Sequence, residues 1–259
     1  MHKIVDSHAH LDDGRFESDL AAVMQRATEA GIAATVVPAT DRASWARIRG
    51  LCGNYPRAHP AYGLHPMFLT EHALAHVDAL SSWLDAHDAV AVGEIGLDFH
   101  VQGVDHDLQR QVFVRQLDVA RVRKLPVIVH ARGALEEVIQ TLRRVDGVYG
   151  VVHSFSGSEQ QAQQLWDIGL CLGIGGPVTY ERAQRLRRIV TRMPLRHLLL
   201  ESDAPDQPDA SHRGQRNEPA RVAGILRCVA ELRGEPEAQI AAATTANARR
   251  LFGLKHQQY

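Results

Sequence analysis

Short apolar runs alternate along the chain with longer segments in which apolar residues recur every three or four positions. Runs of the first kind are typical of buried strands, and segments of the second kind predict amphipathic helices. We expect strands over residues 3–8, 33–39, 59–64, 89–98, 126–131, 148–155, 170–175 and 197–203. We expect helices over residues 15–30, 42–52, 73–86, 108–123, 133–144, 158–169 and 180–190, with two more over 219–234 and 236–254.

Nearly continuous apolar strands separated by helices indicate a parallel sheet that is covered by helices. Eight strand and helix units predict an α/β fold, a single (β/α)8 TIM barrel with extra C-terminal helices. A doubly wound open sheet is the alternative. No linker rich in proline, glycine or serine divides the 259 residues, so we expect residues 1–259 to form a single domain.

Composition, charge and cysteine spacing exclude several classes of protein but do not identify the function. The formal net charge is −1, so the chain lacks the general basic surface that wraps duplex DNA, although a small phosphate pocket remains compatible with it. Cys52, Cys171 and Cys228 show no CxxC spacing, which argues against a disulfide framework or a cysteine zinc site. No secretory signal pattern follows MHKIVDS and no apolar run could span a membrane, which favours a cytoplasmic enzyme. No phosphate-binding glycine motif occurs, so no nucleotide cofactor is expected.

Polar residues follow the predicted strands where a catalytic site would lie. The carboxyl ends of barrel strands form one rim, so residues there converge in space while remaining far apart in sequence. In DSHAH the histidines lie two positions apart, and strand alternation points both rings to the same side. The candidate metal ligands at five strand ends are His8, His10, Glu94, His130, His153 and Asp203.

This set predicts a centre with two divalent metal ions, with Mg, Mn and Zn among the candidates. Imidazole and carboxylate ligands without thiolate suit such ions, and six protein ligands exceed what one catalytic ion normally takes. His8, His10 and Asp203 could hold one ion and His130 with His153 the other. Glu94 could span both ions with its two carboxylate oxygens. Such ions activate water as a nucleophile and stabilise developing negative charge, which is the chemistry of hydrolysis.

At these residues the chain resembles the TatD family of metal-dependent hydrolases, within the amidohydrolase-like barrel superfamily. The similar motifs are DSHAHLD, GLHP, VGEIGLDF, PVIVHARGA, VVHSFSGS and LLLESDAP, with RNEP and NARRLFGL further on. They occur in the family's order over nearly the whole chain. The resemblance implies a (β/α)8 barrel, the same six metal ligands, and hydrolysis of phosphodiester bonds in DNA as the best-known activity.

The resemblance also implies that His65 and Arg132 bind the substrate near the scissile group, where they would contact a phosphate oxygen. An alternative for His65 is that it only closes a turn before Pro66. An alternative for Arg132 is an ion pair with Glu136 or Glu137 on the following helix.

Several other polar residues need a role. Asp203 is expected to be catalytic together with Glu94, because a carboxylate at the end of the last strand can accept the proton of the attacking water and later donate it. Glu201 points to the same side one layer deeper, and a hydrogen-bonded structural acid is its expected role. Most charged residues of the polar loop 205–219 and the arginine-rich segment 182–192 are expected to be solvated surface.

The candidate ligands predict a metal-dependent hydrolase, and the resemblance implies that it cleaves ester bonds of DNA, which we expect at ends or in single strands. A pocket can bind one phosphate through its ions without neutralising many others, which fits the low net charge. The alternative keeps the metal centre and changes the bond, to an amide or ester of a small molecule or an aminoacylated RNA. A non-enzymatic, metal-dependent interaction protein is the third hypothesis.

Overall fold

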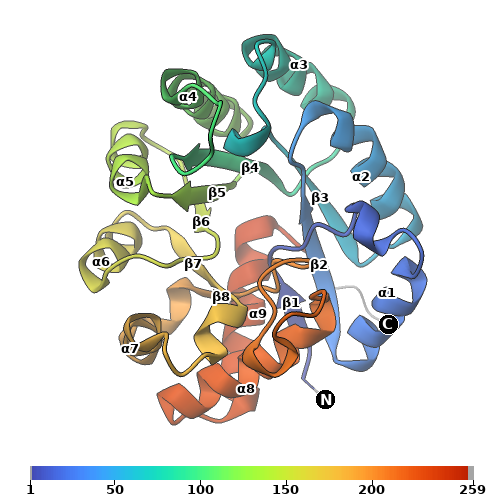
Figure 1. Cartoon of the computed structure of the whole chain (residues 1–259), viewed down its shortest axis with the longest axis vertical. Coiled ribbons are helices and arrows are strands. Elements are labelled where there is room, and N and C mark those ends of the chain that lie inside the picture. The colour runs from blue at the N-terminus through green and yellow to red at the C-terminus, as the bar shows by residue number, and fades with distance from the viewer. Residues whose placement is uncertain (1, 256–259) are drawn as a thin grey trace.

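A computed structural model describes residues 2–255. Eight parallel strands follow one another in sequence order, and helices surround them on the outside (Figure 1). The strands are β1 (Ile4–Asp6), β2 (Ile32–Pro38), β3 (Ala58–Tyr62), β4 (Ala91–Asp98), β5 (Val127–Arg132), β6 (Gly150–Val152), β7 (Cys171–Ile174) and β8 (Leu198–Leu200). Each expected strand is present, although most are shorter than the apolar run that predicted them.

Helices connect the strands as the apolar periodicity predicts. They are α1 (Leu20–Glu29), α2 (Arg42–Asn54), α3 (Ala73–Ala86), α4 (His106–Arg123), α5 (Leu135–Arg144), α6 (Glu159–Asp167), α7 (Gln184–Arg192), α8 (Val222–Arg233) and α9 (Glu237–Phe252). Short 3-10 helices are η1 (Gly14–Phe16), η2 (Pro66–Phe68), η3 (Gly176–Thr179), η4 (Leu195–His197), η5 (Ala210–His212) and η6 (Pro219–Arg221). Within residues 2–255, no helix combines the length and apolarity needed to cross a membrane.

The first expected helix is interrupted, which corrects its predicted start. Residues 14–16 form η1 because the side chain of Asp13 accepts a hydrogen bond from Arg15 N, and α1 begins only at Leu20. The segment expected to be helical over 180–190 likewise begins at Gln184, after the Tyr180 backbone has closed η3. In both places a local cap competes with the continuous helix that the apolar spacing suggests.

The sheet closes on itself at a seam between β8 and β1. Ser7 N donates to Leu200 O at 3.0 Å and Asp203 N donates to His8 O at 2.9 Å. Beyond these bonds, Ala9 and Ala204 form an isolated parallel bridge. The seam confirms the TIM barrel and excludes the doubly wound open sheet.

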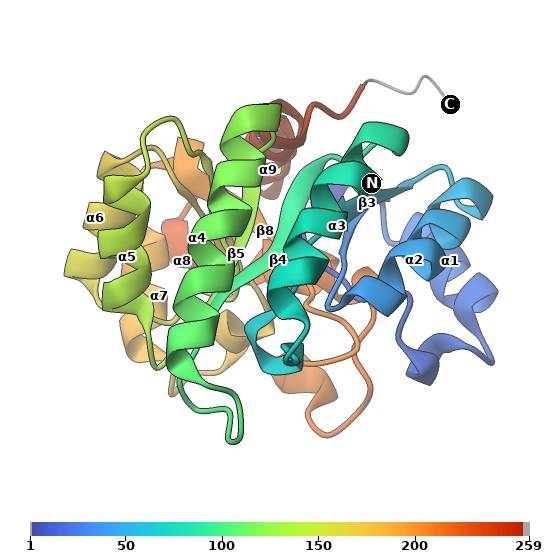
Figure 2. The same cartoon turned by 90° about the horizontal axis from the view of Figure 1, so that it is seen from above.

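The barrel interior is apolar and is covered at one end by α9. Val5, Val36, Ile128 and Leu199 are among its buried residues, and they share one cluster with Phe252 of α9. A second and larger apolar cluster joins the strands to the surrounding helices. Figure 2 shows that the loops after β3, β4 and β8 lie at one end of the barrel, the lower end in that view. Since α9 closes the amino end of the strands, their carboxyl end is left for a site.

Candidate metal centre

The six predicted ligands converge at the carboxyl end of the strands, together with His65. A cavity of about 590 Å³ opens there, and its lining includes His10, Glu94, His130, His153 and Asp203. Glu94 lies within β4 and His130 within β5, and His153 directly follows β6. The others, His8, His10, His65 and Asp203, lie in the loops that begin where β1, β3 and β8 end. The arrangement is the one that strand-end positions in a parallel barrel predict.

Glu94 lies at the centre of the cluster, and its two carboxylate oxygens face different groups. Its Oε2 atom is 3.2 Å from His8 Nε2 and 3.4 Å from His10 Nε2. Its Oε1 atom is 2.7 Å from His153 Nε2, 2.9 Å from His130 Nδ1 and 3.1 Å from His65 Nε2. One carboxylate therefore separates two groups of imidazoles.

Asp203 lies on the first side of this arrangement. Its Oδ1 atom is 3.5 Å from His8 Nε2 and 3.9 Å from His10 Nε2. The backbone of Asp203 has φ of 55°, a left-handed conformation that a non-glycine residue adopts only when its surroundings hold it there. Part of that hold comes from Gln207, whose amide donates to Asp203 Oδ2.

These residues fit divalent cations. Glu94 is 1% exposed, and its Oε2 atom has no hydrogen-bond partner among the described residues. The His8 and His10 Nε2 atoms are 3.2 Å apart, as are His130 Nδ1 and His153 Nε2, so ring nitrogens face one another in pairs. A buried carboxylate oxygen without a hydrogen bond is costly, and a divalent cation would satisfy it together with the ring nitrogens that face one another. The donor set of nitrogen and carboxylate oxygen is one that Zn, Mn and related ions accept.

Burial and neighbouring charges act in opposite directions on the ionisable groups. Burial alone would raise the pKa of Glu94, but His153, His65 and His8 lower it well below its usual value, so the carboxylate is ionised. Burial lowers the pKa of His8, aided by the charge of His153, so its imidazole is neutral and available as a ligand. Burial raises the pKa of Asp203 to about 6.

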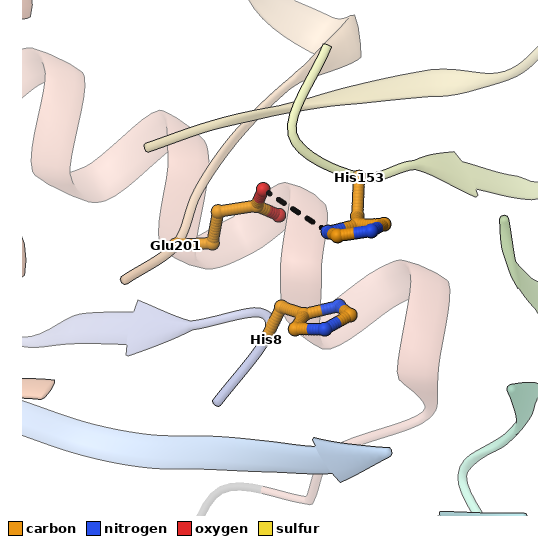
Figure 3. Close-up of side chains that lie close together, drawn as sticks. All are labelled: His8, His153 and Glu201. Carbon is orange, nitrogen blue, oxygen red and sulfur yellow. Dashed lines mark ion pairs between the residues drawn. The ribbon is translucent and has the colours of Figure 1, made fainter. Parts of the chain in front are cut away.

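Figure 3 shows the Glu201 carboxylate facing the His153 ring. It lies nearest Nδ1 of that ring, whereas Nε2 faces Glu94. The Glu201 Oε1 atom accepts a hydrogen bond from Ser154 N at 2.5 Å and is 3.7 Å from His153 Nδ1. Gly173 makes room for it, because a Cβ atom at that position would overlap the carboxylate. The rings of His8 and His153 stack with centroids 4.0 Å apart and planes at 14°. Two stacked rings cannot both direct in-plane nitrogens at one ion, so His8, His153 and Glu201 do not suit a shared ion. Glu201 therefore fits a role in orienting the His153 ring.

The position of His65 is compatible with both roles expected for it, closing the turn before Pro66 and contacting the substrate. Its Nδ1 atom accepts a hydrogen bond from Met67 N at 3.0 Å and so caps η2, while its Nε2 atom faces Glu94. Arg132 lines the cavity with its side chain 57% exposed, and its Nη1 atom is 3.9 Å from Asp98 Oδ2. The alternative ion pair with Glu136 or Glu137 is not formed, because Glu137 binds Arg110 and Glu136 accepts a hydrogen bond from Gln140.

Asp98 and Gln207 are residues that the sequence reasoning missed. Asp98 Oδ2 is 3.3 Å from His130 Nε2, the ring nitrogen opposite the one that faces Glu94. Burial would raise the pKa of Asp98, but the hydrogen bond to His130 lowers it to about 2. The alternation of GEIGLD places Asp98 on the same side as Glu94, so a signal was available. Nothing in the sequence indicated Gln207.

The loop after β8 is better anchored than a solvated segment, which corrects that expectation. Arg216 binds both carboxylate oxygens of Asp19 at 2.7 Å, and Asp206 accepts two hydrogen bonds from Arg15. The buried Asp209 caps η5 by accepting from Ser211 N. These contacts fix one wall of the cavity.

The arginine-rich helix agrees with the expectation of a solvated face. Leu186 and Ile189 of α7 are buried, whereas Arg188 and Arg192 lie on the surface near Glu159. This helix therefore contributes charge to the outside of the barrel, not to the centre.

Sequence comparison gives the family. The family described as TatD related DNase matches residues 5–253. The chain belongs to the TatD family. Among its TatD-type relatives, YjjV of Escherichia coli (strain K12), named as an uncharacterized metal-dependent hydrolase, is 39% identical over 255 residues, covering 97% of this chain and 98% of YjjV. The 3'-5' ssDNA/RNA exonuclease TatD of Citrobacter rodentium (strain ICC168) is 34% identical over 256 residues, covering 96% and 97%.

A solved TatD structure agrees. The crystal structure of YjjV matches this TatD-family chain with a TM-score of 0.93 and 38% identity, covering 97% of this chain and 98% of the other. These findings confirm the resemblance and the barrel, and they make the chain a metal-dependent hydrolase of the TatD type.

Proposed function

We propose that this protein is a divalent-metal-dependent deoxyribonuclease that cleaves phosphodiester bonds at DNA ends or in single strands. The observation that carries the proposal is the position of the buried Glu94 carboxylate. One of its oxygens faces His8 and His10, and the other faces His130 and His153. His8, His10 and Asp203 would hold one cation, His130 and His153 would hold the other, and Glu94 would contact both. We propose Mg, Mn or Zn as the ions.

The ions would supply Lewis acidity and a water of lowered pKa, and the side chains would supply position and proton transfer. Asp203 would accept the proton of the attacking water and return it to the leaving oxygen. Its carboxyl suits this work because it lines the cavity beside His8 and His10, the residues that would hold the same cation. Arg132 would bind a non-bridging phosphate oxygen, and His65, which also lines the cavity, would contact the same group.

The charge at the cavity mouth supports a short contact with nucleic acid over a long one. Arg15 and Arg47 line the mouth, but Arg15 binds Asp13 and Asp206 while Arg47 binds Asp12 at 2.8 Å. Their charges are largely compensated, which leaves Arg132 as the more available cation of this cavity. A site of this kind suits one or two phosphates at an end or in a single strand, and a relative bears the name of a single-strand exonuclease.

The test is hydrolysis of end-labelled DNA by purified protein supplied with Mg²⁺, Mn²⁺ or Zn²⁺. Cleavage should occur with the wild type and be lost in Glu94→Ala, whereas Glu71→Ala, which changes an exposed carboxylate, should match the wild type. Amide, ester and aminoacyl-RNA substrates form the second arm. Turnover of these with DNA untouched would refute the proposal and support the alternative bond. The cytoplasmic location expected from the sequence stays a prediction.

A further inference from the structure

We infer that Phe68 and Met67 form a binding site for an unstacked nucleobase next to the metal centre. The inference rests on the proposed function and deepens it, because it specifies which state of the nucleic acid the site accepts. Phe68 is 49% exposed and Met67 is 37% exposed, and both line the same cavity as Glu94. They are neighbours in η2, directly after His65.

The Phe68 ring is connected to the metal centre through a short series of side chains. Its centroid is 5.7 Å from that of His65, and the His65 centroid is 4.4 Å from that of His130. His65 Nε2 is in turn 3.1 Å from Glu94 Oε1. Only the His65 side chain therefore separates a group stacked on Phe68 from His130 and Glu94, which would hold a cation at the scissile phosphate.

The local backbone fixes this platform before any substrate arrives. Pro66 occupies the start of η2 and is buried, His65 Nδ1 accepts from Met67 N, and Phe68 N donates to His65 O at 3.1 Å. Further back, His65 N donates to Thr40 O at 2.8 Å. The Phe68 ring is left half exposed beside a polar cavity, so its apolar face is available to a ligand. The other exposed large apolar residues of the described chain, such as Val114 and Val122 of α4, lie outside this cavity.

A nucleobase fits this position better than an aliphatic or peptide group. The same cavity presents the exposed guanidinium of Arg132, which suits a phosphate, and the Phe68 ring, which suits the flat face of a base. A base inside a duplex has both faces covered by its neighbours, so it must leave the stack before it can reach the ring. The platform therefore selects single strands and frayed ends over intact duplex.

The test compares Phe68→Ala with the wild type on a single-stranded oligonucleotide and on the same strand carrying an abasic position beside the cleaved bond. On the normal strand the variant should lose roughly 5- to 150-fold in kcat/KM, mostly through KM, because a base stacked on an aromatic ring contributes to binding in the ground and transition states alike. Phe68→Trp should retain activity. Val122→Ala, which truncates a more exposed apolar residue on α4, should match the wild type.

The decisive comparison is whether the loss of activity caused by Phe68→Ala and the loss caused by the abasic position add to each other. If the ring stacks on the base, the abasic strand should be cleaved equally by wild type and Phe68→Ala, because the interaction is already absent. Equal losses on both strands would assign the ring to cavity shape and overturn the inference, as would full activity of the variant on the normal strand. Binding of a slowly hydrolysed phosphorothioate tetranucleotide, measured by fluorescence anisotropy, repeats the comparison without turnover. Absence of DNA cleavage with intact, ring-dependent binding would refute the proposed nuclease function alone.

Discussion

Replacing Glu201 by glutamine tests whether the outer carboxylate orients the metal-facing histidine. Glutamine keeps the shape of the side chain and an oxygen that can accept from Ser154 N, but it removes the negative charge behind His153. We expect weaker binding of divalent cations by a protein that is still folded.

The size of the effect follows from the distance between the two groups. The His153 Nδ1 and Glu201 Oε1 atoms are 3.7 Å apart, and two full charges at that separation interact by ~4.5 kcal/mol at an effective dielectric constant of about 20. If a metal-polarised N–H carries about a third of a unit charge, the interaction is ~1.5 kcal/mol, or roughly tenfold in affinity. This value is at the lower end of the 10- to 100-fold range typical of outer partners of metal-bound histidines, about where a moderately long contact belongs.

The assay is calorimetric titration of metal-free protein with Zn²⁺ or Mn²⁺. Glu159→Gln is the matched control, because it removes an exposed carboxylate near Arg188 without touching the centre. Gly173→Ala adds a Cβ atom that would overlap the Glu201 carboxylate, so this substitution should also weaken cation binding. Nitrogen chemical shifts of the His153 ring report whether the Nδ1 proton is retained. Affinity of Glu201→Gln within twofold of the wild type, with an unchanged ring tautomer, would refute the orienting role.

Three further outcomes follow from the structure. Adding Zn²⁺ or Mn²⁺ at about 100 times its Kd should stabilise metal-free protein by ~2.7 kcal/mol, a rise of roughly 5–10 °C in melting temperature by calorimetry, and Glu94→Ala should abolish most of that rise. Asn217→Ala should lower the free energy of unfolding by about 2–4 kcal/mol in urea, because the buried amide donates to Ser202 O and Asp206 O; a loss below 0.5 kcal/mol would contradict this. Arg188→Gln with Arg192→Gln should leave affinity for single-stranded DNA unchanged, and a tenfold loss would place nucleic acid on α7.

The convergence of the candidate ligands could be predicted because it depends on a rule that the sequence displays. His8 and His10 follow one strand at alternate positions, Glu94 and His130 lie within two others, and His153 and Asp203 follow two more, so knowing the strands is enough to place them on one rim. The separation of the imidazoles by the two oxygens of Glu94 was likewise expected from the number of ligands. The assignment of these residues to two ions stays a prediction.

The supporting contacts could not be predicted, because they join residues whose proximity depends on packing. Nothing in the sequence pairs Glu201 with the space at Gly173, or Arg216 with Asp19. The same holds for the start of α1, where the cap at Asp13 overrides an apolar spacing that favours a longer helix. Side-chain roles that depend on one local hydrogen bond leave no periodic signal.

Because of the seam between β8 and β1, bound cations would affect the stability of the barrel as well as catalysis. His8 and Asp203 lie on opposite sides of it and are joined there by a backbone hydrogen bond, although they are far apart in the sequence. An ion held by both side chains would act as a cross-link that closes a very long loop, and such a link lowers the entropy of the opened chain. Separation of the barrel at this line should then be the opening that bound metal suppresses most. Hydrogen exchange at the amides of Ser7 and Asp203 would report that coupling directly, with no substrate present.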